Sequence, residues 1–343
     1  MADTLIDVQN LKVHFQVAGG GLLGSSRSVV KAVDDVSFTI ERGETLGLVG
    51  ESGSGKTTIG RAILRALPIT EGQIKFQANG SPVELTTLQG KALRSFRKHM
   101  QLIFQDPYSS LNPRMTVRDI IAEPLEAGNL AKTKTELDER VREIAAKCKL
   151  NVEHLRRFPH AFSGGQRQRI CIARALVSSP EFVVCDESVS ALDVSTQAEI
   201  LNLLMDLQKD LGLTYLFIAH DLSVVAHISA RVAVMYVGQI VELADTMDIF
   251  QRPKHPYTQA LLTAIPQVHP ERAFDPVKLE GEIPNPANLP SGCRFHTRCP
   301  FAKERCKSEA PAWREIEPGH FAACHFSDEL DLPGVQVGGG AAA

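Results

Sequence analysis

The chain has 343 residues, of which 43% are hydrophobic, and its 37 basic and 40 acidic side chains give a formal net charge of −3. This length allows one large domain with a full core and a smaller appended domain. A balance so close to neutrality argues against nucleic acid as a main partner. No apolar run approaches the roughly 20 residues that span a bilayer, and the acidic start does not resemble a signal peptide. We therefore expect a cytoplasmic chain that reaches a membrane only by docking on other subunits.

The N-terminal part of the chain is expected to form antiparallel strands. Residues 5–15 alternate loosely between apolar and polar side chains, and residues 29–40 are expected to form a strand pair with a turn at Asp34–Asp35. Residues 71–76 have the pattern of an edge strand. Phe15 lies in this region, where an aromatic ring either stacks on an adenine or belongs to the core.

A glycine-rich motif follows a short apolar strand predicted at residues 45–49. It fits the phosphate-loop pattern G-x-x-x-x-G-K-[ST] without a mismatch and consists of Gly50, Glu51, Ser52, Gly53, Ser54, Gly55, Lys56 and Thr57. Glycines let backbone N–H groups turn around an anion, and the helix predicted from Thr58 onward adds its positive N-terminal end. We expect Lys56 to contact the β- and γ-phosphates of a nucleotide and the Thr57 hydroxyl to bind Mg²⁺. The alternative is a glycine-rich turn that only caps a helix.

The middle of the chain is predicted to be mostly helical. A buried strand at residues 100–104 ends at Gln105, and the two prolines of the loop at 106–113 are expected to exclude a helix there. Residues 114–160 have helical patterns. Ser163 then caps a helix that extends to about residue 178, and its start exposes backbone donors to an anion in Ser163, Gly164, Gly165 and Gln166. Here the alternative is an N-capped helix with a basic first turn.

Two further buried strands end in side chains suited to nucleotide chemistry. The strand at 182–187 ends in Asp186 and Glu187. In a phosphate-loop protein the first acid binds Mg²⁺ directly or through water, and the second can orient and deprotonate an attacking water. The strand at 213–219 ends at His220, which is either structural or functional beside a γ-phosphate. Strands and helices in this order predict a largely parallel α/β sheet with its site at the carboxyl ends of the strands.

Taken together, the ordered motifs resemble the ATP-binding subunits of ABC transporters over residues 5 to about 265. The resemblance implies an α/β fold with a P-loop NTPase core of ABC ATPase type. This fold has a mixed sheet, an antiparallel β subdomain and a helical subdomain at about residues 106–178. ATP and Mg²⁺ are the implied cofactors. The resemblance also implies that a closed site forms only between two ATPase subunits, since the phosphate loop of one faces the signature motif of the other.

The same resemblance assigns roles to individual residues. The implied catalytic group is Glu187 as base, His220 as switch at the γ-phosphate, Gln105 and Lys56. The implied ATP-binding group is Phe15, the loop from Gly50 to Thr57, and Thr58. Magnesium would be held by Thr57, Gln105 and Asp186. Ser163 to Gln166 correspond to the signature motif, and the loop that joins the two sites across the dimer is Ser190, Ala191, Leu192 and Asp193.

One residue departs from the family pattern. Ser188 stands where most members have proline, directly after the implied base. Both acids are present, so we expect hydrolysis to survive.

Three segments resemble the second ATPase subunit of bacterial dipeptide and oligopeptide importers: residues 106–114, residues 255–262 and the tail from Leu289 to Cys324. This implies ATP-driven peptide import by a peripheral protein at the cytoplasmic face of the inner membrane. The implied partners are a sister ATPase subunit, identical or different, two permease subunits and, indirectly, a periplasmic or extracellular substrate-binding protein. Importers of nickel or glutathione are alternatives, as are a soluble ABC ATPase without a permease and a redox-sensing regulator.

The cysteines fall into two groups. Cys148, Cys171 and Cys185 have apolar neighbours and are predicted to be core residues. Four others, Cys293, Cys299, Cys306 and Cys324, lie in an extension predicted at residues 266–330, before a disordered tail at 331–343. In a reducing cytosol such a group favours a metal site over disulfides. Four thiolates suit an iron–sulfur cluster or zinc, and some similar peptide importers carry a [4Fe-4S] cluster there. Reduced thiols remain the alternative, and His296, His320 or His325 could substitute as ligands.

Overall fold

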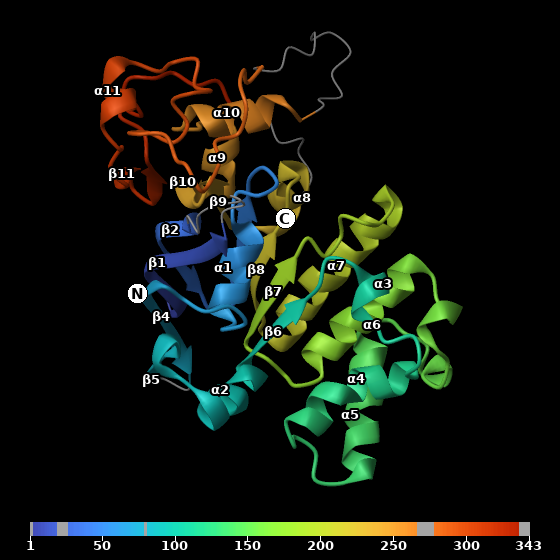
Figure 1. Ribbon diagram of the computed structural model, residues 1–343. Helices are drawn as coiled ribbons and strands as arrows, with labels where there is room; N and C mark the ends of the chain where they lie inside the picture. The colour runs from blue at the N-terminus through green and yellow to red at the C-terminus, as the bar shows by residue number, and fades with distance from the viewer. Residues whose placement is uncertain (1–2, 19–26, 79–80, 266–277, 336–343) are drawn as a thin grey trace.

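The computed structural model describes residues 3–18, 27–78, 81–265 and 278–335, which form two sheets with helices around them (Figure 1). The first sheet is antiparallel, has the order β2-β1-β4-β5, and consists of β1 (Thr4–Ala18), β2 (Arg27–Glu41), β4 (Glu71–Ala78) and β5 (Ser81–Glu84). The larger sheet has the order β11-β12-β10-β9-β3-β8-β7-β6. Its strands are β3 (Thr45–Val49), β6 (Met100–Ile103), β7 (Phe182–Asp186), β8 (Thr214–Ile218), β9 (Arg231–Tyr236), β10 (Gln239–Asp245), β11 (Arg314–Glu317) and β12 (His320–Ala322).

Two predictions about the antiparallel sheet are wrong. The segment 29–40 is one continuous strand, β2, and not a pair with a turn at Asp34–Asp35. Leu11 pairs with Val36 and Val13 with Val33, so β2 carries one extra residue, which Asp35 accommodates in a bulge with φ +65°. β4 is an inner strand because the short β5 pairs with its free side.

The parallel part of the larger sheet positions the predicted site. Strands β9, β3, β8, β7 and β6 run parallel, so their carboxyl ends meet at one edge. The phosphate loop follows β3, Gln105 follows β6 closely, and Glu187 follows β7. Strands β3, β7 and β8 are buried on both faces, which explains their continuous apolar sequences. The site therefore collects residues from three separate parts of the chain.

Two apolar clusters lie on opposite faces of this sheet. Along β7, Val183 and Cys185 join one cluster while Phe182 and Val184 join the other, as the two-residue period of a strand requires. The second cluster includes α1 (Lys56–Ile63) and the antiparallel sheet. The first includes residues of α4 (Val117–Ala127), α5 (Lys134–Lys147), α6 (Gly164–Leu176), α7 (Val194–Leu211), α8 (Leu222–Ile228), α9 (Thr246–Gln251) and α10 (Pro256–Thr263). Cys148, Cys171 and Cys185 are buried there, as predicted.

The predicted helical region is present and lies at the opposite end of the molecule from the C-terminal segment (Figure 1). The prediction that prolines exclude a helix at 106–113 is wrong, because α3 (Pro107–Ser110) is a single helical turn. Pro107 occupies its first position, where a missing N–H costs nothing, and Asp106 caps the turn. The remaining short elements are α2 (Gly90–Phe96) and the 3₁₀ turns Leu85–Thr87, Arg97–His99, Val152–His154 and Pro159–Ala161.

The segment after α10 extends the main sheet instead of standing apart from it. It contains α11 (Glu304–Ser308), β11 and β12. Glu242 of β10 pairs with Ala322 of β12. Leu332 is buried and the Val335 N–H donates to the Phe250 carbonyl, so residues 331–335 of the segment predicted to be disordered are packed. The rest of that prediction, 336–343, lies outside the described residues. Within the described residues, no helix has the length and apolar character needed to cross a membrane.

Candidate functional site: a phosphate loop with a carboxylate pair

The phosphate loop encloses the head of its lysine. Lys56 Nζ donates to the carbonyls of Gly50 at 2.7 Å and Glu51 at 2.9 Å, and Lys56 is only 4% exposed. Burial lowers the pKa of Lys56, while the nearby Glu187 and Asp186 oppose that shift. Gly55 has φ +110°, and a Cβ there would lie 2.2 Å from the Ala32 carbonyl oxygen. The loop thus holds a cation at its centre in a shape that requires glycine.

Two of the predicted magnesium ligands lie together. Thr57 Oγ1 donates to Asp186 Oδ1 at 2.8 Å, and Arg61 Nη2 lies 3.8 Å from the other carboxylate oxygen. Asp186 is 3% exposed, and burial raises its pKa although the Thr57 hydrogen bond acts against the shift. A hydroxyl and a carboxylate are the hard oxygen donors that Mg²⁺ prefers, so this pair fits the ion.

The third predicted ligand, Gln105, lies beside the predicted base. Its Nε2 donates to Glu187 Oε2 at 2.8 Å, and His220 Nδ1 lies 3.6 Å from the same oxygen. The Glu187 backbone has φ +47°, and its N–H donates to the Ile218 carbonyl at the end of β8. The Glu187 side chain keeps 19% of its surface exposed, so water has access to a carboxylate held between an amide and an imidazole.

Ser188, which directly follows the predicted base, is accommodated with its hydroxyl buried. It is 1% exposed, and its hydroxyl has no hydrogen-bond partner among the described residues. The backbone turn after Glu187 is held instead by Ser190, whose N–H and Oγ both donate to the Glu187 carbonyl, the latter at 2.9 Å. The predicted joining loop then ends at Asp193, which caps α7 by accepting from the Thr196 N–H at 3.0 Å.

The signature segment begins α6 as predicted. Ser163 and Gln166 form a reciprocal capping box. A Cβ on Gly164 would lie 3.7 Å from Leu192, and one on Gly165 would lie 2.5 Å from Thr196 Cγ2, so these glycines pack against the joining loop and α7. No hydrogen bond links Ser163–Gln166 to the phosphate loop within residues 3–18, 27–78, 81–265 and 278–335.

Phe15 lies on β1, opposite Val30 of β2, and is partly buried against the antiparallel sheet's core. Sequence reasoning missed two residues that contact the loop. Arg298 forms an ion pair with Glu51, and Tyr257 accepts a hydrogen bond from the Glu51 N–H at 2.9 Å. Tyr257 lies in one of the segments that indicated the importer type, but no local pattern marks Arg298 or its pairing with Glu51.

The four C-terminal cysteines line one small cavity of about 20 Å³, together with aromatic side chains that include Phe295, Phe301 and Phe326. None of the seven cysteines, all within the described residues, forms a disulfide. Burial raises the pKa of Cys293 to about 11 and that of Cys299 to about 12. In the described part of the chain, no three His, Cys, Asp or Glu side chains are grouped as a metal ion would require.

Two family models match the chain. The one described as ABC transporter matches residues 33–190, and the one described as oligopeptide/dipeptide transporter, C-terminal region, matches residues 241–306. The oligopeptide transport ATP-binding protein AppF of Bacillus subtilis (strain 168) is 49% identical over 327 residues, which cover 94% of this chain and 98% of AppF. The chain belongs to the ABC transporter ATP-binding family.

Further comparisons agree with this membership. A putative peptide import ATP-binding protein of Brucella ovis is 51% identical over 320 residues, covering 93% of this chain and 97% of that protein. A dimeric ATP-binding cassette solved in a post-hydrolysis state with ADP and phosphate has a TM-score of 0.61 at 25% identity, covering 71% of this chain and 99% of that one. The ABC ATPase fold predicted from the ordered motifs is thereby confirmed.

Proposed function

We propose that this ABC protein is the ATP-hydrolysing subunit of an importer of di- and oligopeptides. The observation that carries the proposal is Glu187, held by Gln105 at 2.8 Å and lying next to Asp186, which accepts a hydrogen bond from Thr57 in the phosphate loop. Lys56 stabilises negative charge on the β- and γ-phosphates, and Glu187 takes a proton from the water that attacks the γ-phosphate. Mg²⁺, when bound, would neutralise phosphate charge beside Thr57 and Asp186.

The site of one copy is proposed to be half of the working site. The signature segment and the phosphate loop share no hydrogen bond among the described residues, and a structurally similar cassette is a dimer. Ser163 to Gln166 would therefore complete the nucleotide site of a second ATPase subunit, with Ser190 to Asp193 joining the two sites. The second subunit would be an identical copy or a sister chain.

A cleft beside Gln105 is proposed to receive the permease. It has a volume of about 760 Å³ and is lined by residues of the helical region and of the Gln105 loop, including Phe104, Glu123 and Arg174. Phe104 is 42% exposed, and Gln105 connects the cleft directly to Glu187. A permease segment seated there would place the protein at the cytoplasmic face of the membrane, with a substrate-binding protein on the other side.

The peptide cargo follows from the relatives, which are named as oligopeptide or peptide import proteins, and from the match of residues 241–306. Nickel, glutathione or related cargo is the alternative. We expect the transporter purified with its permease and placed in vesicles to accumulate labelled di- or oligopeptides when ATP is supplied. Uptake of nickel or glutathione in place of peptides would select the alternative.

The base assignment is tested by Glu187→Gln. This variant should bind ATP, accumulate as a closed dimer and hydrolyse ATP at least about 100-fold more slowly, because the amide cannot accept the proton of the attacking water. Steady-state phosphate release and size-exclusion chromatography with ATP measure both effects. Glu143→Gln, which changes an exposed glutamate on α5, is the matched control and should match wild type. Turnover at the wild-type rate in Glu187→Gln would remove the assignment.

We also propose that the cysteine cavity binds a thiol-ligated metal, with a [4Fe-4S] cluster ahead of zinc. The convergence of Cys293, Cys299, Cys306 and Cys324 on one apolar cavity supports this, although the side chains as described are not grouped for a metal ion. Anaerobic purification followed by visible absorbance and metal analysis tests it. Protein without iron or zinc that retains its ATPase activity would instead favour reduced thiols that hold the segment compact.

A further inference from the structure

Arg298 of the C-terminal segment reaches into the phosphate loop. Its Nη1 and Nη2 donate to the two carboxylate oxygens of Glu51 at 2.7 and 3.0 Å. The Arg298 side chain is only 8% exposed, whereas Glu51 is the second residue of the loop and keeps 27% of its side chain exposed. A two-pronged guanidinium–carboxylate contact fixes direction as well as distance, so it constrains the loop more than a single ion pair would.

The backbone of Glu51 is held from the same side. Its N–H donates to the Tyr257 hydroxyl, and the Tyr257 ring packs against Phe295 of the C-terminal segment with centroids 5.4 Å apart. Phe295 also meets Tyr236, at the end of β9, edge-on at 5.1 Å. These three rings are buried, so the segment that carries Arg298 is anchored next to the loop by apolar contact as well as by charge.

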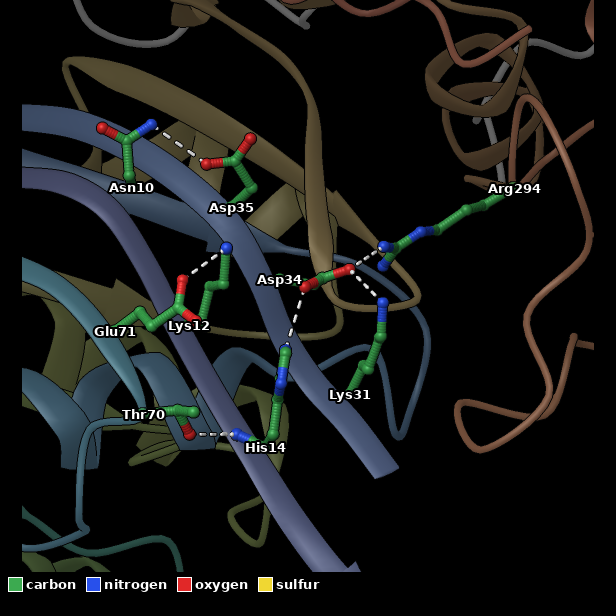
Figure 2. Close-up of polar contacts among 9 residues, drawn as sticks. All are labelled: Asn10, Lys12, His14, Lys31, Asp34, Asp35, Thr70, Glu71 and Arg294. Carbon is green, nitrogen blue, oxygen red and sulfur yellow. Dashed lines mark hydrogen bonds and ion pairs between the residues drawn. The ribbon is translucent and has the colours of Figure 1, made fainter. Parts of the chain in front are cut away.

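A second arginine of the segment secures the neighbouring turn. Arg294 donates to Asp34 of β2, as Figure 2 shows, and its Nη1 donates to the Val237 carbonyl at 2.6 Å. Gly238, the next residue of that turn, donates its N–H to the Ser54 carbonyl in the phosphate loop at 2.8 Å and accepts from the Asp34 N–H at 2.8 Å. The C-terminal segment therefore contacts the loop directly through Arg298 and indirectly through Arg294.

The Arg298 contact matters for nucleotide binding because Glu51 carries a negative charge. Glu51 stands in a loop whose other features attract anions, and an unpaired carboxylate there would repel the phosphates of a nucleotide. Arg298 supplies the compensating charge and turns the carboxylate toward the C-terminal segment. Lys56 also attracts the Glu51 charge from within the loop. Arg298, however, is the only hydrogen-bond and ion-pair partner found for the Glu51 carboxylate within residues 3–18, 27–78, 81–265 and 278–335.

We propose that the C-terminal segment positions the phosphate loop and that Arg298 is the positioning residue, so that nucleotide affinity depends on a part of the chain outside the ATPase core. This inference rests on the proposed nucleotide site and adds a residue to it. Arg298 does not touch the reacting atoms. Its loss should weaken ATP binding and raise the KM for ATP, with a smaller effect on kcat.

The test measures ATP binding by calorimetry in the Glu187→Gln background, and KM and kcat in the otherwise unchanged full chain. Arg298→Ala should weaken ATP binding about ten-fold, and Arg298→Lys, which keeps the charge but not the two-pronged contact, should show an intermediate loss. Adding Glu51→Gln to Arg298→Ala should restore most of the affinity, because it removes the unpaired charge. The matched control is Arg314→Ala, which breaks an exposed pair with Asp328 in the same segment and should leave affinity unchanged.

The outcomes separate this inference from the proposed function. If the parent binds ATP and Arg298→Ala binds within two-fold of it, the inference is overturned and the proposed function stands. Equal losses in Arg298→Ala and Arg314→Ala would also overturn it, since they would indicate general loosening of the segment. If Arg298→Ala does not fold, unchanged ATP affinity in Arg298→Lys would overturn the inference instead. A parent that does not bind ATP would overturn the proposed function together with the inference.

Discussion

At the scale of single residues, the site contains charges that the fold itself does not favour. Asp186 is 3% exposed and its pKa is raised, chiefly by burial, while burial lowers the pKa of Lys56. Both shifts mean that folding works against the charged form of each group. Each charge is also the one that Mg²⁺ or a phosphate requires, so the nucleotide site is maintained at some expense of stability.

We therefore expect Asp186→Asn to stabilise the nucleotide-free protein at neutral pH, by about 1 kcal/mol. Because the folded-state pKa of Asp186 lies above its unfolded value, the ionised carboxylate costs stability at neutral pH. That cost disappears as the pH falls through the folded pKa toward the unfolded one. The amide oxygen can still accept the Thr57 hydrogen bond. Urea unfolding at several pH values should show a gain that shrinks toward acid pH.

The control for Asp186→Asn is Asp119→Asn, for which the expected change in stability has the opposite sign. Hydrogen bonds from Thr116 and Arg118 lower the pKa of Asp119 despite some burial, so its charge contributes stability above the unfolded pKa and loses it as pH falls. Asp119→Asn should thus destabilise at neutral pH. If Asp186→Asn were also less stable than wild type there, the account of Asp186 as an unfavourable buried charge would be wrong.

At the scale of elements, the close approach of α6 and α7 explains one signature glycine. A Cβ at Gly165 would lie 2.5 Å from Thr196 Cγ2, on a β-branched side chain whose hydroxyl donates to Asp193 at 2.8 Å. Thr196 cannot move aside without losing that contact, since its rotamer is restricted. Gly164 has no neighbour closer than 3.7 Å to such a Cβ. Gly165 is therefore needed for close packing between the two helices, whereas Gly164 is not.

Gly165→Ala should destabilise the protein by about 1–2 kcal/mol through overpacking, reduced by the better helix propensity of alanine. Thr196→Ser removes Cγ2 but keeps the hydroxyl, so the double variant should recover most of the loss. Gly164→Ala, the matched control, should retain wild-type stability or exceed it. Denaturant midpoints of wild type, Gly165→Ala, Thr196→Ser and the double variant measure the coupling between the two positions. Equal effects of Gly165→Ala with Thr196 and with Ser at 196 would contradict the proposed contact.

The sequence predicted elements well wherever the signal was local. The strands before the phosphate loop and before Glu187, and the capped start of α6, follow from apolar runs and turn chemistry within a few residues. The errors arose where similar signals have two structural outcomes. Asp34–Asp35 suggested a turn but forms a bulge inside β2, and Pro107 suggested a helix breaker but begins α3. Only the pairing with β1 and the cap from Asp106 decide these cases.

At the scale of the whole molecule, the C-terminal segment is part of the main sheet and contacts the phosphate loop. The residues that join it to the rest are distant in sequence, as Arg298 is from Glu51, and single charged residues carry no periodic pattern. Sequence motifs therefore located Lys56, Glu187 and their neighbours but not the contacts that position the loop. β12 reaches the sheet beside β10, where a buried side-chain pair fixes the junction.

That junction supports the last prediction. Glu242 is fully buried and accepts from the N–H groups of Lys254 and His255 and from His320 Nε2 at 2.7 Å. His320→Ala leaves the carboxylate without its side-chain partner, so it should destabilise the protein by about 3 kcal/mol. It should also expose the C-terminal segment to proteases before the core unfolds. Urea unfolding and limited proteolysis with mapped cleavage sites measure both effects.

The control for His320→Ala is Arg305→Ala, which breaks an exposed pair with Glu309 on α11 and should change stability by less than about 0.5 kcal/mol. Because the same segment carries Arg298, His320→Ala should in addition weaken ATP binding, whereas Arg305→Ala should not. A His320→Ala protein with wild-type stability and an uncleaved C-terminal segment would show that β12 is held by other contacts. In that case the contacts of Arg294, Phe295 and Arg298 would still hold the segment beside the phosphate loop.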